Sequence, residues 1–492
     1  MAAAVDEKQH DSEAVTIPSE DGSTGSSVEI DPKADKALIR KVDAHVVPFI
    51  VVMYLFSFLD RVNIGNARLY GLEEDLGLVG DQFQIAVSIL FVPYCLLEVP
   101  SNLVIRKLTA SRYLAAICCI WGIVATLTGV TQNFAGLIVC RLILGAAEAG
   151  LFPGLVAYMT LFYGKREIAL RVGYLFSAAA LAGACGGLLA YAIGFMDGVA
   201  GQKGWRWILI VEGLPSVLIG IAVWFGLADD PDTAYYLTEE EKALMRARRS
   251  LEIGQTASAQ QFHIKDAKEG AKDWTVILFC VSQFGVDTVL YGYSTFLPTI
   301  IKSIGTWSTP QVQALTIPCY ALGAITYLVV AWFSDRMQKR AVFTVVFCGI
   351  TIVGYGILMA DASAGVHYFG CFTVAVGLYV CVGLPLAWLP TNLPRFGKRT
   401  FATGLQLTMG NIAGVMVPFV YPNRTAPRYI MGHAVTLSLT GFSLIVYAFM
   451  WYWYSRINRN RDAGKEDYKI EGMSENEIQE MGDRNPRFRY TT

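Results

Sequence analysis

Twelve apolar runs, each as long as a helix that crosses a lipid bilayer, limit most strongly what this 492-residue chain can fold into. A bilayer core needs about 20 mostly apolar residues per α-helix. Such runs cover residues 44–67, 82–105, 113–131, 134–163, 172–196 and 205–227 and, after a polar break, residues 274–301, 312–333, 342–360, 368–393, 401–420 and 430–454. Only 16% of residues are charged, against roughly 25% in soluble domains. The sequence therefore predicts an all-α polytopic membrane protein with twelve transmembrane helices.

The polar break divides the twelve spans into two groups of six. The predicted units are a disordered N-terminal tail (1–43), a six-helix bundle (44–228), a linker (229–273), a second six-helix bundle (274–456) and a C-terminal tail (457–492). The bundles also repeat, since "SNLVIRK" closes the second span and "SDRMQKR" closes the eighth, each with a final basic pair. Two related bundles joined by a linker are typical of transporters that rock around a central site.

Basic residues in the short loops predict the orientation in the membrane. Clusters of Lys and Arg precede the first span and follow the second, fourth, eighth and tenth spans, which places all of them on one side. By the positive-inside rule, both termini and the linker are expected in the cytosol. The first residues contain no apolar segment of a signal peptide, and we expect the chain in the plasma membrane. The sequon at Asn423 would then lie outside and could carry a glycan.

Several classes of function are not supported by the composition and motifs. With 40 basic and 41 acidic residues there is no electrostatic case for a nucleic-acid partner. The ten cysteines lack the CxxC and His partners of metal sites, and the chain contains no HExxH, HxxxxD or GxxxxGK[ST] motif. We therefore expect no enzyme activity, no metal and no cofactor, and a chain that acts as a monomer. A channel is also disfavoured, because buried acid and base pairs at mid-depth would trap an ion.

Charged residues inside the spans are the strongest functional signal. "FLDRVNIGNA" contains Asp60, Arg61 and Asn63, and "RLILGAAEAGLFPG" contains Arg141 and Glu148. Each such charge costs about 2.5–3.5 kcal/mol at mid-helix, so it normally faces a cavity or a partner. Counted along their helices, Asp60 and Glu148 both stand roughly 25 Å from the cytosolic boundary, and they can be neighbours.

Two interpretations of these charges are open. In the functional one, Arg61 and Arg141 bind an anionic substrate while Asp60 and Glu148 take up protons, so that substrate and proton compete for the same arginines. In the structural one, the four residues form fixed ion pairs that lock helices together.

Further polar residues occupy otherwise apolar spans. Glu98 is expected at a gate between helices or bonded to a loop, and Asp287 either takes up a second proton or satisfies the backbone of a broken helix. The candidates for substrate binding, besides the two arginines, are Asn63, Tyr291, Tyr293, Trp388, Asn392, Gln406 and Asn411. Aromatic packing and bonds between helices are the alternatives for these side chains.

With these motifs, and with "GWRWILIVEGLP" and "FLPTIIKSIG", the stretch 44–457 resembles the major facilitator superfamily, its anion:cation symporter family and, within that, the fungal allantoate-permease branch. Members of that branch carry nicotinate, pantothenate, biotin, ureides and other small carboxylates, commonly with protons. The resemblance implies the major facilitator fold, proton coupling at Asp60 and Glu148, and anion binding at Arg61 and Arg141. It also implies a cytosolic gate at Asp335, Arg336 and Arg340 of "SDRMQKR", while "SNLVIRK" lacks the matching Asp-Arg.

The sequence thus predicts a proton-coupled symporter of a small organic anion, nicotinate or another vitamin-like carboxylate, that works by alternating access. The expected partners are this anion, protons and the lipid bilayer. The alternatives are export of an acidic metabolite by the same fold and a nutrient sensor that does not transport.

Overall fold

A computed structural model describes residues 14–16, 27–29, 31–105, 108–251, 263–422 and 425–492. Within these residues, eleven helical stretches are long and apolar enough to cross a membrane. They are α1 (Pro32–Leu69), α5 (Ala110–Thr128), the pair α6 and α7 (Phe134–Glu148 and Leu151–Phe162), α8 (Lys165–Ile193), α9 (Gly204–Gly226), α13 (Trp274–Ile304), α14 (Thr309–Met337), α15 (Ala341–Met359), α16 (Ala364–Thr391), α17 (Phe396–Val420) and α18 (Ile430–Asp462). The predicted span 82–105 consists of two shorter helices, α3 (Gln82–Ser88) and α4 (Phe91–Ile105).

The remaining elements are short. They are the paired strands β1 (Ala14–Thr16) and β2 (Ser27–Glu29), the helices α2 (Leu72–Asp75), α10 (Glu239–Leu251), α12 (Ile264–Lys272) and α19 (Glu475–Glu480), and the 3₁₀ turns η1 (Gly194–Met196), η2 (Val199–Gly201), η4 (Asp467–Ile470) and η5 (Gly482–Arg484). Helices α10 and α12 lie in the region predicted as a linker. The sequon at Asn423 lies outside the described residues.

Local signals explain where the long helices begin and break. Helix α1 begins at Pro32, earlier than the apolar run, because the Asp31 side chain caps it by accepting a bond from the amide of Lys33 and proline suits the first helical position. The fourth predicted span breaks after Glu148, where Gly150 packs against the side chains of Ser101 and Tyr113 and leaves no room for a Cβ atom. The break places Glu148 at the end of α6.

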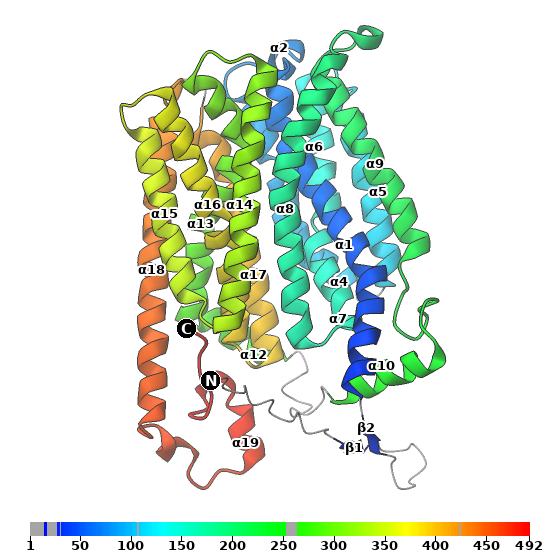
Figure 1. The fold of residues 1–492 in the computed structure, drawn as a ribbon, viewed down its shortest axis with the longest axis vertical. Helices are drawn as coiled ribbons and strands as arrows, with labels where there is room; N and C mark the ends of the chain where they lie inside the picture. The colour runs from blue at the N-terminus through cyan, green and yellow to red at the C-terminus, as the bar shows by residue number, and fades with distance from the viewer. Residues whose placement is uncertain (1–13, 17–26, 30, 106–107, 252–262, 423–424) are drawn as a thin grey trace, which may run out of the picture.

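The long helices form two halves, α1–α9 and α13–α18, which lie side by side in Figure 1. Within the first half, α5 packs along α9 and α1 along α8 and α9; within the second, α15 packs along α16 and α13 along α17 and α18. Helices α8 and α14 meet at the centre of the view. The start of α1 and residue Thr492 lie at one end of the molecule, here called the terminal end, and α2 lies at the other, the far end.

The two halves touch directly toward the far end. The backbone of Gly65 on α1 lies against the carbonyl oxygen of Thr295 on α13, so that a Cβ atom there would overlap it. Gly414 on α17 similarly accommodates the ring of Phe91, and Ser88 Oγ donates a hydrogen bond to the carbonyl oxygen of Val415 over 2.8 Å. These contacts bring backbones of opposite halves together in the part of the molecule away from both tails.

Candidate functional site

An ion pair between two helices of the first half forms the centre of the site. Arg61 Nε on α1 donates to Glu148 Oε2 on α6 over 2.7 Å, and the two side chains are 14% and 0% exposed. The guanidinium also lies over the ring of Tyr94 on α4, 4.6 Å from its centroid. Three helices therefore hold Arg61 in place. The second carboxylate oxygen of Glu148 has no hydrogen-bond partner within the described residues.

Arg141 lies beside this pair but is held differently. It is 2% exposed on α6, two turns before Glu148. In the described part of the chain it takes part in no ion pair, and its Nε has no hydrogen-bond partner. An uncompensated buried charge is costly in a protein interior. Glu148 and Asp60 are in electrostatic contact with Arg141, but neither forms a direct ion pair with it.

A cavity between the halves joins both arginines. Its lining consists of Phe58, Arg61, Ile64, Val87, Leu90, Phe91 and Arg141 from the first half and Tyr291, Ser294 and Thr295 from the second. Tyr291 packs edge-on against Phe91, with ring centroids 4.7 Å apart, and its hydroxyl donates to Asn411 Oδ1 over 2.6 Å. The cavity thus combines cationic groups with aromatic walls, and in this structure its volume of about 10 Å³ admits roughly one water molecule.

Asp60 and Asn63 point into the interior of the first half, away from this cavity. Asp60 interacts electrostatically with Glu148, Arg141 and Glu212, and its Oδ2 has no hydrogen-bond partner among the described residues. Asn63 Nδ2 donates to Glu212 Oε2 on α9. Sequence reasoning missed Glu212, although it is the only acidic residue in the apolar run 205–227, which was a sufficient signal.

The second half contains its own buried polar cluster. Gln283 Nε2 donates to Asp287 Oδ1 over 3.0 Å on α13, and Gln406 Nε2 on α17 donates to Gln283 Oε1 over 3.1 Å. Gln406 and Asp287 therefore contact each other through Gln283, another residue that sequence reasoning missed. None of the three lines the cavity.

Glu98 joins the two halves. On α4 of the first half it accepts a hydrogen bond from Thr408 Oγ1 on α17 of the second half over 3.1 Å, and it is buried. This contact lies nearer the terminal end than the Phe91 to Gly414 contact, because both residues are further toward that end of their helices. A bond of this kind must break when the halves separate there.

Three further candidate residues do not line the cavity, and their polar groups bond to backbone atoms elsewhere. Tyr293 donates to the carbonyl oxygen of Cys371 over 2.9 Å inside the second half. Trp388 Nε1 donates to the carbonyl oxygen of Thr491 over 2.8 Å, and Asn392 both donates to that oxygen and accepts from the Thr491 amide. The backbone of Thr491 thus takes up the hydrogen-bonding groups of Trp388 and Asn392, which the sequence suggested for substrate binding.

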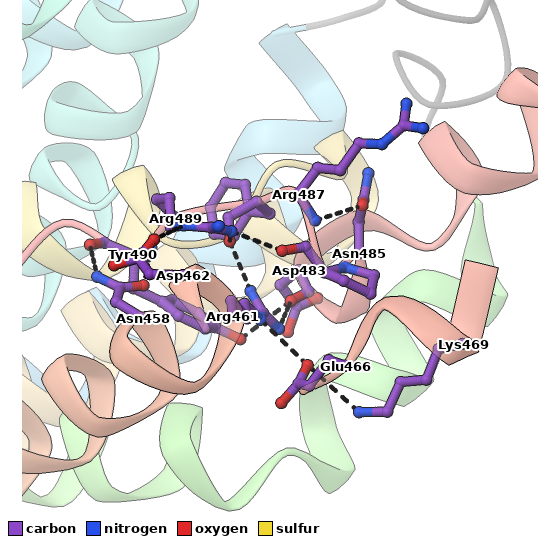
Figure 2. Close-up of polar contacts among 12 residues, drawn as sticks. Asn458, Arg461, Asp462, Glu466, Lys469, Asp483, Asn485, Arg487, Arg489 and Tyr490 are labelled. Atoms are coloured by element: carbon purple, nitrogen blue, oxygen red, sulfur yellow. Dashed lines mark hydrogen bonds and ion pairs between the residues drawn. The ribbon is translucent and has the colours of Figure 1, made fainter. Parts of the chain in front are cut away.

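The C-terminal segment is folded against the second half (Figure 2). Asn458 on α18 makes two hydrogen bonds with the backbone of Tyr490, and Arg461 donates to the carbonyl oxygens of Asp483 and Phe488. The Tyr490 ring stacks on Tyr454 with centroids 4.4 Å apart.

Two cations near the terminal end each bind one acid from the linker region and one from the C-terminal segment. Arg395 pairs with Asp266 and Glu480, and Lys398 pairs with Asp273 over 2.6 Å and Asp483 over 2.9 Å. Burial alone would raise the pKa of Asp273, but the hydrogen bond and charge of Lys398 outweigh it and lower that pKa.

The predicted gate residues lie at the end of α14 and in the turn that follows. Arg340 pairs with Asp335 over 3.4 Å, its backbone amide donates to the carbonyl oxygen of Thr492 over 2.9 Å, and Arg336 lies over the ring of Trp332. The structure therefore connects this loop to the C-terminal segment.

A helical bundle with buried charges around a cavity between two halves defines a polytopic membrane transporter. A family model described as Major Facilitator Superfamily matches residues 50–418. The chain belongs to this superfamily and is a transporter of a small molecule, not an enzyme.

Relatives and solved structures agree with this class. An uncharacterized transporter of Schizosaccharomyces pombe is 39% identical, with 92% of this chain and 90% of the relative covered. The high-affinity nicotinic acid transporter of Saccharomyces cerevisiae is 31% identical, with 93% and 85% covered. A crystal structure of a bacterial homolog of the human lysosomal transporter Spinster, inward-facing and unoccupied, has a TM-score of 0.64 at 16% identity and covers 85% of this chain and 96% of its own. The predicted all-α polytopic fold of this superfamily is confirmed.

Proposed function

We propose that the chain is a proton-coupled symporter that carries a small organic anion across the plasma membrane by alternating access. The observation that carries the proposal is Arg141, a buried cation without an ion-pair partner in the described residues, on the wall of a cavity that Arg61 also lines. An anion that enters this cavity can form the direct ion pair that Arg141 lacks in the described residues. The buried ion pair of Arg61 and Glu148 next to it couples anion binding to proton binding.

The coupling follows from competition for Arg61. A substrate carboxylate that approaches Arg61 must replace Glu148, and a displaced, desolvated carboxylate is strongly unfavourable. A proton on Glu148 removes that cost, so anion and proton bind together more readily than either binds alone. Asp60, in electrostatic contact with Glu148 and Arg141, is the neighbouring acid through which this proton is exchanged.

Orientation fits uptake from outside. The basic clusters of the short loops assign the terminal end to the cytosol, so the far end, where the halves touch at Gly65 and Gly414, is extracellular. The structure is then closed to the outside. Opening toward the cytosol breaks the Glu98 to Thr408 bond, and opening to the outside breaks the contacts at Gly65 and Gly414.

The aromatic walls favour a flat carboxylate such as nicotinate. Once the halves move apart, a planar ring can pack against the contacting rings of Phe91 and Tyr291 while its carboxylate reaches Arg61 and Arg141, and Asn411 orients the Tyr291 hydroxyl. The yeast relative named for nicotinic acid and the resemblance to the allantoate-permease branch point to the same class.

Binding of nicotinate and of its neutral amide to the purified protein tests the proposal. We expect nicotinate to bind and nicotinamide, which differs only in the carboxylate, to bind at least about tenfold more weakly, because a charge-assisted bond contributes roughly 1.5–3 kcal/mol. Equal binding of the two would contradict anion recognition by Arg61 and Arg141.

A further inference from the structure

The contact between Asn63 and Glu212 leaves two buried oxygen atoms without a hydrogen-bond donor in the described residues. Asn63 Nδ2 on α1 donates to Glu212 Oε2 on α9, and both residues are at most 2% exposed. This bond leaves Asn63 Oδ1 and Glu212 Oε1 without hydrogen-bond partners in the described part of the chain. Both remaining atoms are acceptors, so the pair lacks one hydrogen.

A single proton on Glu212 would complete the pair. If Glu212 Oε1 carries a hydrogen, it can donate to Asn63 Oδ1 while Asn63 Nδ2 donates to Glu212 Oε2, in the closed arrangement that a carboxylic acid and a carboxamide form together. One hydrogen then satisfies two buried atoms, each of which would otherwise cost about 1–3 kcal/mol.

The surroundings of Glu212 do not offer a positive charge in place of the proton. None of the ion pairs in the described residues includes Glu212. The titratable groups in electrostatic contact with it are Asp60 on α1 and the Cys185 thiol on α8. An acid and a thiol cannot neutralise a carboxylate, which leaves a proton as the remaining means.

We propose that Glu212 is a second proton-binding site of the transport cycle, which receives its proton from Asp60 and holds it against Asn63. Asp60 stands in electrostatic contact with both Glu148 at the cavity and Glu212 in the bundle interior, and Asn63 is one turn further along the same helix face. In the transfer, the O–H bond on Asp60 breaks, an O–H bond on Glu212 forms, and the negative charge moves to Asp60 beside Arg141. The exchange step rests on the proposed function.

Glu212→Gln is the decisive variant. Glutamine has the shape of the protonated acid and can make both hydrogen bonds to Asn63, so the fold and substrate exchange are preserved, but it cannot give up a proton. With labelled nicotinate in proteoliposomes, we expect fewer protons to enter per nicotinate than in the wild type. Each coupled proton contributes about tenfold accumulation per unit of pH gradient, so accumulation should fall by about that factor. Glu74→Gln, at an exposed position on α2 at the far end, is the matched control.

The number of protons per nicotinate decides the outcome for Glu212. An unchanged ratio in Glu212→Gln overturns its role as an exchanging site. Infrared spectroscopy of the purified protein tests proton binding separately: the wild type should have a protonated-carboxyl band that Glu212→Gln lacks. Absence of that difference also overturns the proposal. A wild type that moves no protons with nicotinate contradicts the proposed function instead, and the infrared result still decides whether Glu212 holds a proton.

Discussion

Arg61 Nε on α1 lies 2.7 Å from Glu148 Oε2 at the last position of α6, and Arg141, two turns earlier on α6, has no ion-pair partner in the described residues. Two arginines thus share one wall of the cavity with one directly bound acid between them. The unequal arrangement favours the proposed anion-binding site over the alternative of two fixed ion pairs. Substitution of Arg61 and substitution of Arg141 should therefore have different effects.

Arg141→Ala should weaken nicotinate binding by about tenfold to a hundredfold, because it removes a charge-assisted bond of roughly 1.5–3 kcal/mol. Thermal stability should change little, since Arg141 makes no direct ion pair within the described residues. Calorimetric binding and thermal unfolding of the purified variant check this, with the exposed Arg112→Ala as control. A large loss of stability with unchanged affinity would support a purely structural Arg141.

Glu148→Gln should strengthen nicotinate binding at neutral pH and remove most of its pH dependence. Glutamine mimics the protonated acid, so Arg61 becomes available to the substrate without proton uptake. Accumulation against a gradient should be lost while exchange of labelled for unlabelled nicotinate continues. Affinity measured from acidic to neutral pH checks the prediction, and a pH dependence like that of the wild type would argue against Glu148 as a coupling acid.

Gly65→Leu should prevent closure at the far end, because even a Cβ atom at this position overlaps the Thr295 carbonyl oxygen. In a background without native cysteines, Ser294→Cys on the cavity wall should then react with a membrane-impermeant thiol reagent from outside. Gly356→Leu is the matched control, since no atom lies within 4 Å of a Cβ built there. Labelling that is equal in the two glycine variants would show that the contact does not seal the far end.

Lys398→Met should release the C-terminal segment from the second half, at a cost of about 1–3 kcal/mol in the free energy of docking, because two acids lose their cation. Hydrogen exchange of residues 475–492 should become faster, while Lys465→Met, at an exposed position, should leave it unchanged. Exchange at the wild-type rate in Lys398→Met would mean that the remaining contacts at Asn458 and Arg461 suffice.

Acid should weaken the linker side of the same Lys398 contact in the wild type. The pKa of Asp273 is lowered in the folded protein, because the bond and charge of Lys398 outweigh burial. Its contribution to stability is therefore present above the unfolded pKa of about 3.9 and is lost as the pH falls through the lower folded value. Hydrogen exchange of residues 263–275, corrected for its intrinsic pH dependence, should remain slow near neutral pH and become faster only below about pH 4.

The sequence contains the positions of the buried charges but not the directions of their side chains. Apolar runs and helix height place Asp60 and Glu148 at one level, with Arg141 two turns from Glu148, because both follow from counting residues along a helix. Which arginine meets Glu148 depends on the rotation of α1 against α6, which is decided by packing. Glu212 was recognisable as a lone acid in an apolar run, whereas its hydrogen bond to Asn63 was not predictable.

Contacts with distant segments were beyond sequence reasoning. Trp388 and Asn392 have the chemistry of substrate-binding residues, but the backbone of Thr491 takes their hydrogen bonds. Nothing in the local pattern of α16 signals a chain segment that returns from residue 491.

Uptake of labelled nicotinate tests directly whether the chain accumulates an organic anion by coupling it to protons. Cells expressing the chain at their surface are compared at acidic and neutral outside pH, with and without a protonophore, with pantothenate, biotin and allantoate as unlabelled competitors, and in parallel with Asp60→Asn. We expect nicotinate accumulation to rise with acidity and to be abolished by the protonophore. In Asp60→Asn, accumulation should be lost while exchange of labelled for unlabelled nicotinate persists. Accumulation that is independent of pH and of the protonophore, or full accumulation by Asp60→Asn, would contradict proton coupling through Asp60.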